Sequence, residues 1–296
     1  MIKTISPMPY EFMVKFTSQE AWIKGRGIFL WLAFFFSEIG AGIYLVSIFI
    51  DLRAGWLLGW LITLVVGGGL HLLYLGKPAR ALLMFLKPLK SELSRGLWFI
   101  SAFAVLGFIQ VAPVVMPNLP WTGNSAALKI ITGMICIFVI IHGFLTMSAM
   151  RAIPVWNTAM MVPLAVASGL WVGSQVIVLL SYFLGQKLGP SEIWARWSLL
   201  CLIVLFGLFI LGAVQSSTTA QLSIKRMVAG DWSGPFYIGV IVIGIILPLV
   251  ITIIAWGNDI EKFGIGVLLL RCLCVFIGDL MIRYGLMRNA VYSPLI

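Results

Sequence analysis

Long apolar segments separated by short polar loops follow one another along the whole chain. Eight of them contain roughly 20 predominantly apolar residues, the length that a helix needs to cross a bilayer. Backbone groups in lipid must be paired within the segment, and the period-two alternation of a barrel is absent, so the pattern predicts an all-α integral membrane protein with eight transmembrane helices. The predicted spans cover about residues 28–50, 56–76, 96–116, 127–147, 160–184, 194–214, 235–256 and 264–286.

The composition agrees with this interpretation. Of the 296 residues, 61% are hydrophobic and only 10% are charged, whereas a soluble domain carries about 25% charged residues. Residues 1–27 are polar and lack the apolar core and cleavage site of a signal peptide, so we expect no cleaved leader. The loops are too short for a soluble domain and we find no internal repeat. We therefore interpret residues 1–296 as a single membrane domain.

Basic residues are unevenly shared between the two sets of loops. The loops on the side of the termini carry 13 Lys and Arg residues, whereas those on the opposite side carry 3. Because positive charge gathers in cytoplasmic loops, we expect a cell-membrane protein with both termini in the cytoplasm. A docking surface for an acidic partner would produce the same bias. The net charge of +10 does not indicate nucleic-acid binding, since no soluble domain is available to hold a duplex.

A few ionisable side chains lie inside the predicted spans, where they are costly and face a cavity, a partner or the bundle interior. Glu38 has no basic residue within one turn, so it is protonated, paired with another helix, or exposed to a wet cavity. His71 and Tyr74 lie near the end of the second span, where a Tyr can also be an interfacial anchor. Asp279 and Arg283 are four residues apart and can pair, either for function or to fix helix packing.

The residues also limit the chemistry. The four cysteines lie inside predicted spans without a Cys-x-x-Cys motif, so we expect neither an iron–sulfur cluster nor a metal site. The only two histidines, His71 and His142, lie at similar depth, which permits one bis-histidine haem. We favour a proton-exchanging role for His71 and no haem. Protonatable groups near one membrane face favour a quinone, whose head needs hydrogen bonds and whose tail needs lipid.

Two other classes of function stay open. A secondary transporter or ion-translocating subunit would use Glu38, Arg271 and Asp279 as its pathway. The repeats and interrupted helices that are common in transporters are not found in the sequence. A purely structural anchor would assemble with its partners and bind no quinone.

Several motifs, in a consistent order, resemble those of NrfD-like membrane subunits, which include the anchors of polysulfide reductase and dimethyl sulfoxide reductase. The segment YLGKPARALLMFLKPLKSELSRGLW (74–98) is similar to the Leu-Gly-x-Pro-x-Arg loop and the later Ser-Arg-Gly-x-Trp of that family. Four further segments resemble its other blocks: EIGAGIYL (38–45), RAIPVWNTAMMVPLAVASGLWVG (151–173), GPFYIGVIVIGIILPL (234–249) and GDLMIRYGLMRNAVY (278–292).

The resemblance implies two helical bundles without haem, and a quinone-reactive anchor. Such an anchor exchanges electrons between menaquinone or ubiquinone and a four-cluster iron–sulfur subunit, which is joined to a molybdopterin or tungstopterin catalytic subunit. The resemblance also implies a quinone site near the start of the first helix and the loop between the second and third. The residues at matching positions are Gln19, Trp22, Tyr74, Arg80, Trp156 and Arg283.

These residues suggest roles at a quinone. We expect His71 to exchange protons with the head, Tyr74 to donate a hydrogen bond to it, and Arg80 to stabilise developing negative charge. Some family members have a His at the position of Tyr74. Glu38 and Asp279 are acids where many relatives have an apolar residue or Gly, and we expect them to relay protons.

Overall fold

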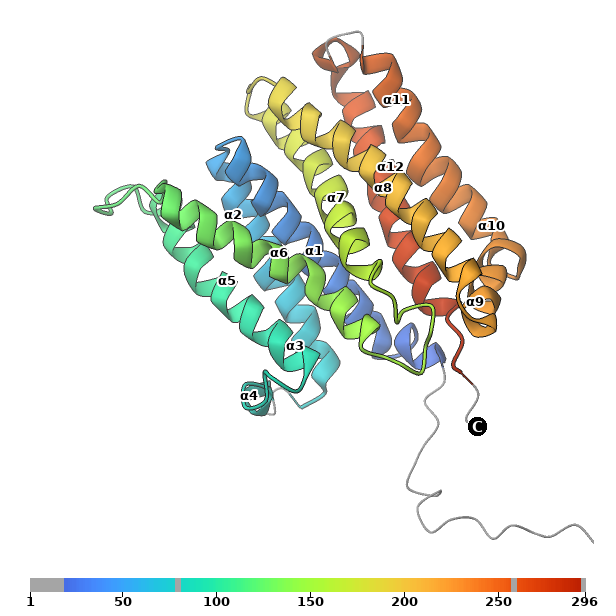
Figure 1. The fold of residues 1–296 in the computed structure, drawn as a ribbon. Coiled ribbons are helices and arrows are strands. Elements are labelled where there is room, and N and C mark those ends of the chain that lie inside the picture. The colour runs from blue at the N-terminus through green and yellow to red at the C-terminus, as the bar shows by residue number, and fades with distance from the viewer. Residues whose placement is uncertain (1–18, 78–80, 257–259, 294–296) are drawn as a thin grey trace, which may run out of the picture.

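The computed structural model describes residues 19–77, 81–256 and 260–293, and these are mostly helical (Figure 1). Eight helical segments within them are long and apolar enough to cross a membrane, and every boundary lies within five residues of the predicted one. This confirms the predicted fold class. Six of the spans are α1 (Gly27–Phe49), α5 (Glu92–Val115), α6 (Ala126–Ser148), α7 (Met161–Phe183), α8 (Gly189–Gln215) and α12 (Gly264–Arg288).

The second and seventh spans are continuous but each contains a π-helical stretch. The second span consists of α2 (Arg53–Leu61), the π-helical stretch Ile62–Gly68 and α3 (Gly69–Leu75). The seventh consists of α10 (Ser233–Pro235), the π-helical stretch Phe236–Ile246 and α11 (Leu247–Trp256). The sequence pattern did not predict these stretches. The remaining elements are short: α4 (Ala81–Met84), α9 (Thr218–Ala229) and the 3-10 turns Gln19–Trp22 and Ile260–Phe263.

The spans form two groups in chain order, which agrees with the expected pair of bundles (Figure 1). The first four spans, from α1 to α6, pack together, and the last four, from α7 to α12, make the second group. Helices α1 and α7 are the most buried spans and pack against each other where the groups meet. The outer helices expose many large apolar side chains, as a lipid-facing surface requires.

Glycines allow α1 and α7 to approach closely. A Cβ atom added to Gly42 would collide with the carbonyl oxygen of Gly169, and one added to Gly173 would lie 2.5 Å from the carbonyl carbon of Gly42. Small residues at such crossings let two helix backbones touch, because packing rather than a hydrophobic force drives association in lipid. The contact between the two groups therefore depends on these glycines.

We expect Gly42→Ala to push α1 away from α7 and to destabilise the protein by roughly 1–3 kcal/mol, the usual cost of overpacking. The measurement is the Tm of the detergent-solubilised protein. The matched control is Gly207→Ala in α8, where an added Cβ meets nothing within 4 Å and should be neutral or slightly stabilising. Equal Tm values for the two variants would contradict the role of Gly42.

The π-helical stretch in the second span shapes the end of that span. It ends in two glycines, and α3 begins with a third; a Cβ on Gly67 would collide with the hydroxyl of Ser37 in α1. Such stretches alter the regular pattern of carbonyl pairing and are frequent at functional sites. Here the Gly67 carbonyl accepts a hydrogen bond from Nδ1 of His71 at 2.9 Å.

Candidate functional site

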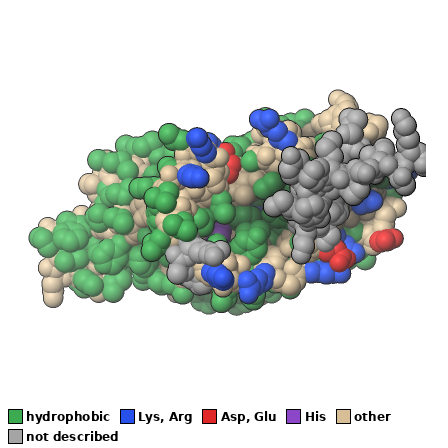
Figure 2. All heavy atoms as spheres, turned by 90° about the horizontal axis from the view of Figure 1, so that it is seen from below, with side chains coloured by type: hydrophobic (Ala, Val, Ile, Leu, Met, Phe, Trp, Pro, Cys, Tyr) green, Lys and Arg blue, Asp and Glu red, His purple; other side chains and the backbone are tan. Residues whose placement is uncertain are grey.

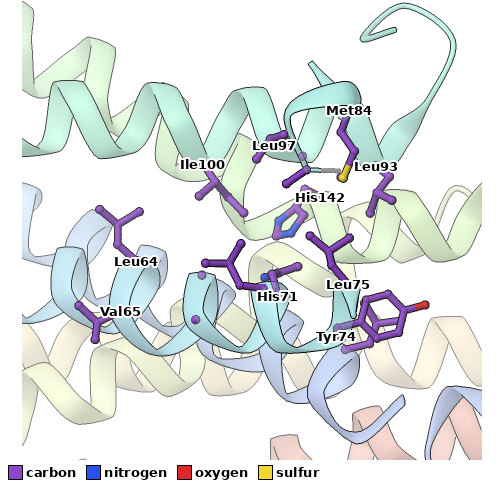
Figure 3. Close-up of a pocket in the computed structure, with 16 residues that line it drawn as sticks. Leu64, Val65, His71, Tyr74, Leu75, Met84, Leu93, Leu97, Ile100 and His142 are labelled. Atoms are coloured by element: carbon purple, nitrogen blue, oxygen red, sulfur yellow. The ribbon is translucent and has the colours of Figure 1, made fainter. Parts of the chain in front are cut away.

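A cavity of about 340 Å³ lies between α3, α4, α5 and α6. Its volume is within the range of small-molecule pockets, which starts at about 300 Å³. Most of its wall is apolar (Figure 3), and its polar side chains are His71 and Tyr74 from α3 and His142 from α6. Seen from below relative to Figure 1, a histidine is visible in a hollow among hydrophobic side chains (Figure 2).

The rings of the two histidines lie next to each other at the inner part of this pocket. Their ring centroids are 5.7 Å apart and the rings are tilted by 39°. Nδ1 of His71 lies 2.9 Å from the carbonyl oxygen of Gly67, and Nδ1 of His142 lies 2.6 Å from that of Val139. A carbonyl can only accept, so each Nδ1 carries the proton. The neutral rings therefore present Nε2 as an acceptor.

Tyr74 stands at the rim of the pocket, and its hydroxyl points away from the two imidazoles (Figure 3). The structure thus brings two predicted residues, His71 and Tyr74, to one cavity. It adds His142, which the sequence indicated only as a possible haem ligand. Arg80, the third residue expected here, lies outside the described residues.

Phe34 of α1 packs against both histidines. Its ring centroid is 5.6 Å from that of His71 and 5.6 Å from that of His142. Leu30 lines the pocket one turn before it, and Glu38 follows one turn after it. Residues four apart share a helix face, so this face of α1 leads from the pocket toward the buried carboxylate.

Glu38 belongs to a buried charge cluster that it forms with Ser168, Asp279 and Arg283. Arg283 donates from Nη2 to Glu38, from Nε to Oδ2 of Asp279 at 2.9 Å, and from Nη2 to the hydroxyl of Ser168 at 2.8 Å. Ser168 in turn donates to Asp279. All four side chains are buried. The predicted Asp279–Arg283 pair is confirmed, and of the three states considered for Glu38, the structure has the pairing with another helix.

The charge cluster connects three helices that are distant in the sequence. Glu38 comes from α1, Ser168 from α7, and Asp279 and Arg283 from α12. The guanidinium of Arg283 also lies over the ring of Phe144, 5.0 Å from its centroid. Phe34, whose ring contacts both histidines, and Arg283 line the same small void.

Gln19, Trp22 and Trp156 lie away from the pocket, around the C-terminal end of α12. The amide of Gln19 donates to the carbonyl of Met287, and the indole of Trp156 donates to the carbonyl of Leu286 at 2.9 Å. The rings of Trp22 and Trp156 meet edge to face with centroids 5.1 Å apart. These contacts tie the N-terminal turn to α12, and none of the three residues lines the histidine pocket.

Two further buried polar groups lie elsewhere. Arg271 makes a two-pronged ion pair with Glu192 of α8, with distances of 2.8 and 2.5 Å. Glu192 lies just before the predicted span 194–214, and the pattern of spans did not indicate this pair. Gln110 accepts hydrogen bonds from Tyr44 at 2.9 Å and from Thr132 at 2.6 Å. The sequence could have indicated Gln110 as a buried polar residue, because it lies inside an apolar span.

Comparison with protein families identifies the chain's family. The family model described as polysulphide reductase, NrfD, matches residues 25–293, which include both the pocket and the charge cluster. No curated protein matches the sequence. The match covers nearly the whole chain and agrees with the resemblance seen in the motifs. The chain therefore belongs to the NrfD polysulphide reductase family of membrane subunits.

Proposed function

We propose that the chain is the quinone-reactive anchor of a multi-subunit oxidoreductase and that the histidine pocket binds the quinone head. The observation that carries this proposal is the meeting of two imidazoles in a mostly apolar cavity. A quinone head needs hydrogen-bond partners, whereas its isoprenoid tail needs apolar surface. Val65 and Leu72, which line the cavity, are 65% and 50% exposed and offer such a surface toward the lipid.

We propose that the electrons pass between the quinone and a four-cluster iron–sulfur subunit bound to a molybdopterin or tungstopterin subunit. Membership of a family of polysulphide reductase-like membrane subunits supports partners of this kind. Lys87 and Lys90 are exposed in the segment that follows α4, beside the pocket. Their positive charges suit the docking of a partner with an acidic surface. The excess of basic residues on this side also supports a cytoplasmic position for both termini in the cell membrane.

The proposed chemistry assigns separate tasks to the residues. Interconversion of quinone and hydroquinone moves two electrons and two protons. Nε2 of His71 exchanges protons with the head group, and His142, whose Nε2 is buried, packs against His71. The Tyr74 hydroxyl offers a hydrogen-bond donor near the mouth of the pocket. The charge cluster offers Glu38 and Asp279 as proton carriers toward the interior.

The test is a gentle detergent purification of the chain with its bound partners, followed by metal analysis, quinone extraction and an absorption spectrum. We expect iron, molybdenum or tungsten, and stoichiometric quinone. A haem spectrum would instead identify His71 and His142 as axial ligands. A metal-free and quinone-free protein would contradict the proposal and would favour a transporter that uses Glu38.

A further inference from the structure

We infer that a second cavity, at the C-terminal ends of α9 and α12, binds the head group of a phospholipid that carries both a phosphate and a primary ammonium. This cavity shares no lining residue with the histidine pocket. The inference goes beyond the proposed function, because it concerns a lipid held by the chain and does not depend on quinone chemistry.

The first step is the charge of the cavity. Its volume is about 490 Å³, which is within the range of small-molecule sites. It lies between the N-terminal 3-10 turn and the ends of α9 and α12, and four charged side chains line it: Glu20, Arg226, Asp231 and Arg288. Their formal charges sum to zero, so the cavity suits a ligand that carries charges of both signs.

The second step is the pairing of these charges. Glu20 is paired with Lys24 at 2.7 Å. The side chains of Arg226 and Asp231 make no ion pair or hydrogen bond within the part of the chain that the structure describes, although both line the same cavity. A ligand that holds an anion and a cation a short linker apart would give both of them a partner.

The third step is the position of the cavity relative to the bilayer. α9 has 12 residues, too few to span a membrane. It connects the end of α8 to the start of the seventh span and packs against both (Figure 1). A segment that joins the ends of two spans lies at the membrane surface. Arg226, in the last turn of α9, is therefore at the level of the lipid head groups.

Aromatic side chains beside the cavity support this level. Trp232 lines the cavity, its ring centroid is 6.2 Å from that of Tyr284, and Tyr284 in turn lies 5.8 Å from Trp31. Trp and Tyr gather where the bilayer meets water. Tyr237 and Ile238, at the start of the seventh span, are 52% and 62% exposed and offer apolar surface to acyl chains. A phospholipid with its head in the cavity thus keeps its tails in the bilayer.

The fourth step is the choice of head group. In phosphoethanolamine the phosphate accepts charge-assisted hydrogen bonds from Arg226 and Arg288, and the ammonium donates to Asp231. A choline head has no N–H donor and a glycerol head has no cation, so each loses the contact with Asp231. An acidic segment of a partner protein would meet the carboxylates of Glu20 and Asp231 as like charges. The lining therefore favours the zwitterionic lipid.

The experiment measures lipid binding to the purified, delipidated full chain, with the partners that it retains, by native mass spectrometry. Dioleoyl phosphatidylethanolamine is compared with phosphatidylcholine and phosphatidylglycerol of the same chains. Free phosphoethanolamine and inorganic phosphate are the soluble probes. We expect phosphatidylethanolamine to bind at least about tenfold more tightly than each of the other four, because only this lipid makes every polar contact and keeps its tails in the bilayer.

Variants test the two unpaired charges. Arg226→Gln and Asp231→Asn should each weaken binding of phosphatidylethanolamine by about tenfold or more. Asp231→Asn should also remove the preference over phosphatidylcholine. Lys225→Gln is the matched control, since it removes one positive charge from an exposed position of α9 that does not line the cavity. It should bind like the wild type.

Three results would overturn the inference. Equal binding of the three lipids, or equal loss in Arg226→Gln and Lys225→Gln, would mean that the cavity does not recognise the head group. Soluble phosphate or phosphoethanolamine that binds as tightly as the lipid would indicate a soluble ligand. Loss of partner subunits from Arg226→Gln but not from Lys225→Gln would indicate a protein-docking surface. The comparison of probes on the wild type decides the question even if a variant does not fold.

Discussion

Arg283→Leu should destabilise the protein by about 3–5 kcal/mol, the usual cost of removing one partner of a buried ion pair. Arg283 pairs with Glu38 and Asp279 and bonds Ser168, so its loss leaves two carboxylates facing each other in a buried site. These contacts also connect α1, α7 and α12. We expect a large fall in Tm in detergent and a low yield of assembled complex.

The control for this variant is Arg288→Leu, five residues further along α12. Arg288 is exposed, and its contact with the Tyr284 hydroxyl is 3.5 Å long, so its loss should cost less than about 1 kcal/mol. Adding Glu38→Gln and Asp279→Asn to Arg283→Leu removes the uncompensated charge and should recover part of the stability. If Arg283→Leu were as stable as Arg288→Leu, the charge cluster would not hold the bundles together.

His71→Phe should lower quinol-linked activity of the complex by about 10²- to 10⁴-fold, the usual contribution of a positioned acid or base. Phenylalanine fills a similar volume but cannot bind a hydroxyl or take its proton. The activity of the partner subunits with an artificial electron donor should not change, because that route does not pass through the pocket. The measurement is the ratio of the two activities in the same preparation.

Met84→Leu is the matched control, since Met84 lines the same pocket with an apolar side chain. It should leave both activities close to wild type. Unchanged quinol kinetics in His71→Phe would exclude His71 from the proton step. Equal loss of both activities would indicate a failure of assembly rather than of quinone chemistry.

The spans could be predicted closely because lipid imposes a length and an unbroken apolar pattern on each helix. The charge cluster could be predicted only in part. Asp279 and Arg283 pair within one helix, and their spacing showed it. Glu38 and Arg283 are 245 residues apart in the chain, and the contact depends on how α1 and α12 pack, which periodicity does not describe.

The site residues show the same limit. His71 and His142 could be assigned a common depth, but the rotation of α3 and α6 that turns both rings to one cavity is set by packing and by the π-helical stretch before α3. Gln19, Trp22 and Trp156 were selected by matching motifs. A motif gives a position along the chain but not the cavity that a side chain faces, and these three lie at the end of α12 instead.

The most direct test of the quinone pocket is to fill it without damaging the fold. Gly69 lines the cavity, and an added Cβ there meets nothing within 4 Å, so Gly69→Leu extends a side chain into the free space and also favours the helix. Gly266→Leu is the control, because an added Cβ at this exposed position of α12 also meets nothing within 4 Å. The measurement is the quinone extracted per purified complex.

We expect stoichiometric quinone in the wild type and in Gly266→Leu, and almost none in Gly69→Leu, with the same Tm and the same partner subunits in all three. Full quinone content in a folded Gly69→Leu complex would show that quinone binds elsewhere and would contradict the assignment of the histidine pocket.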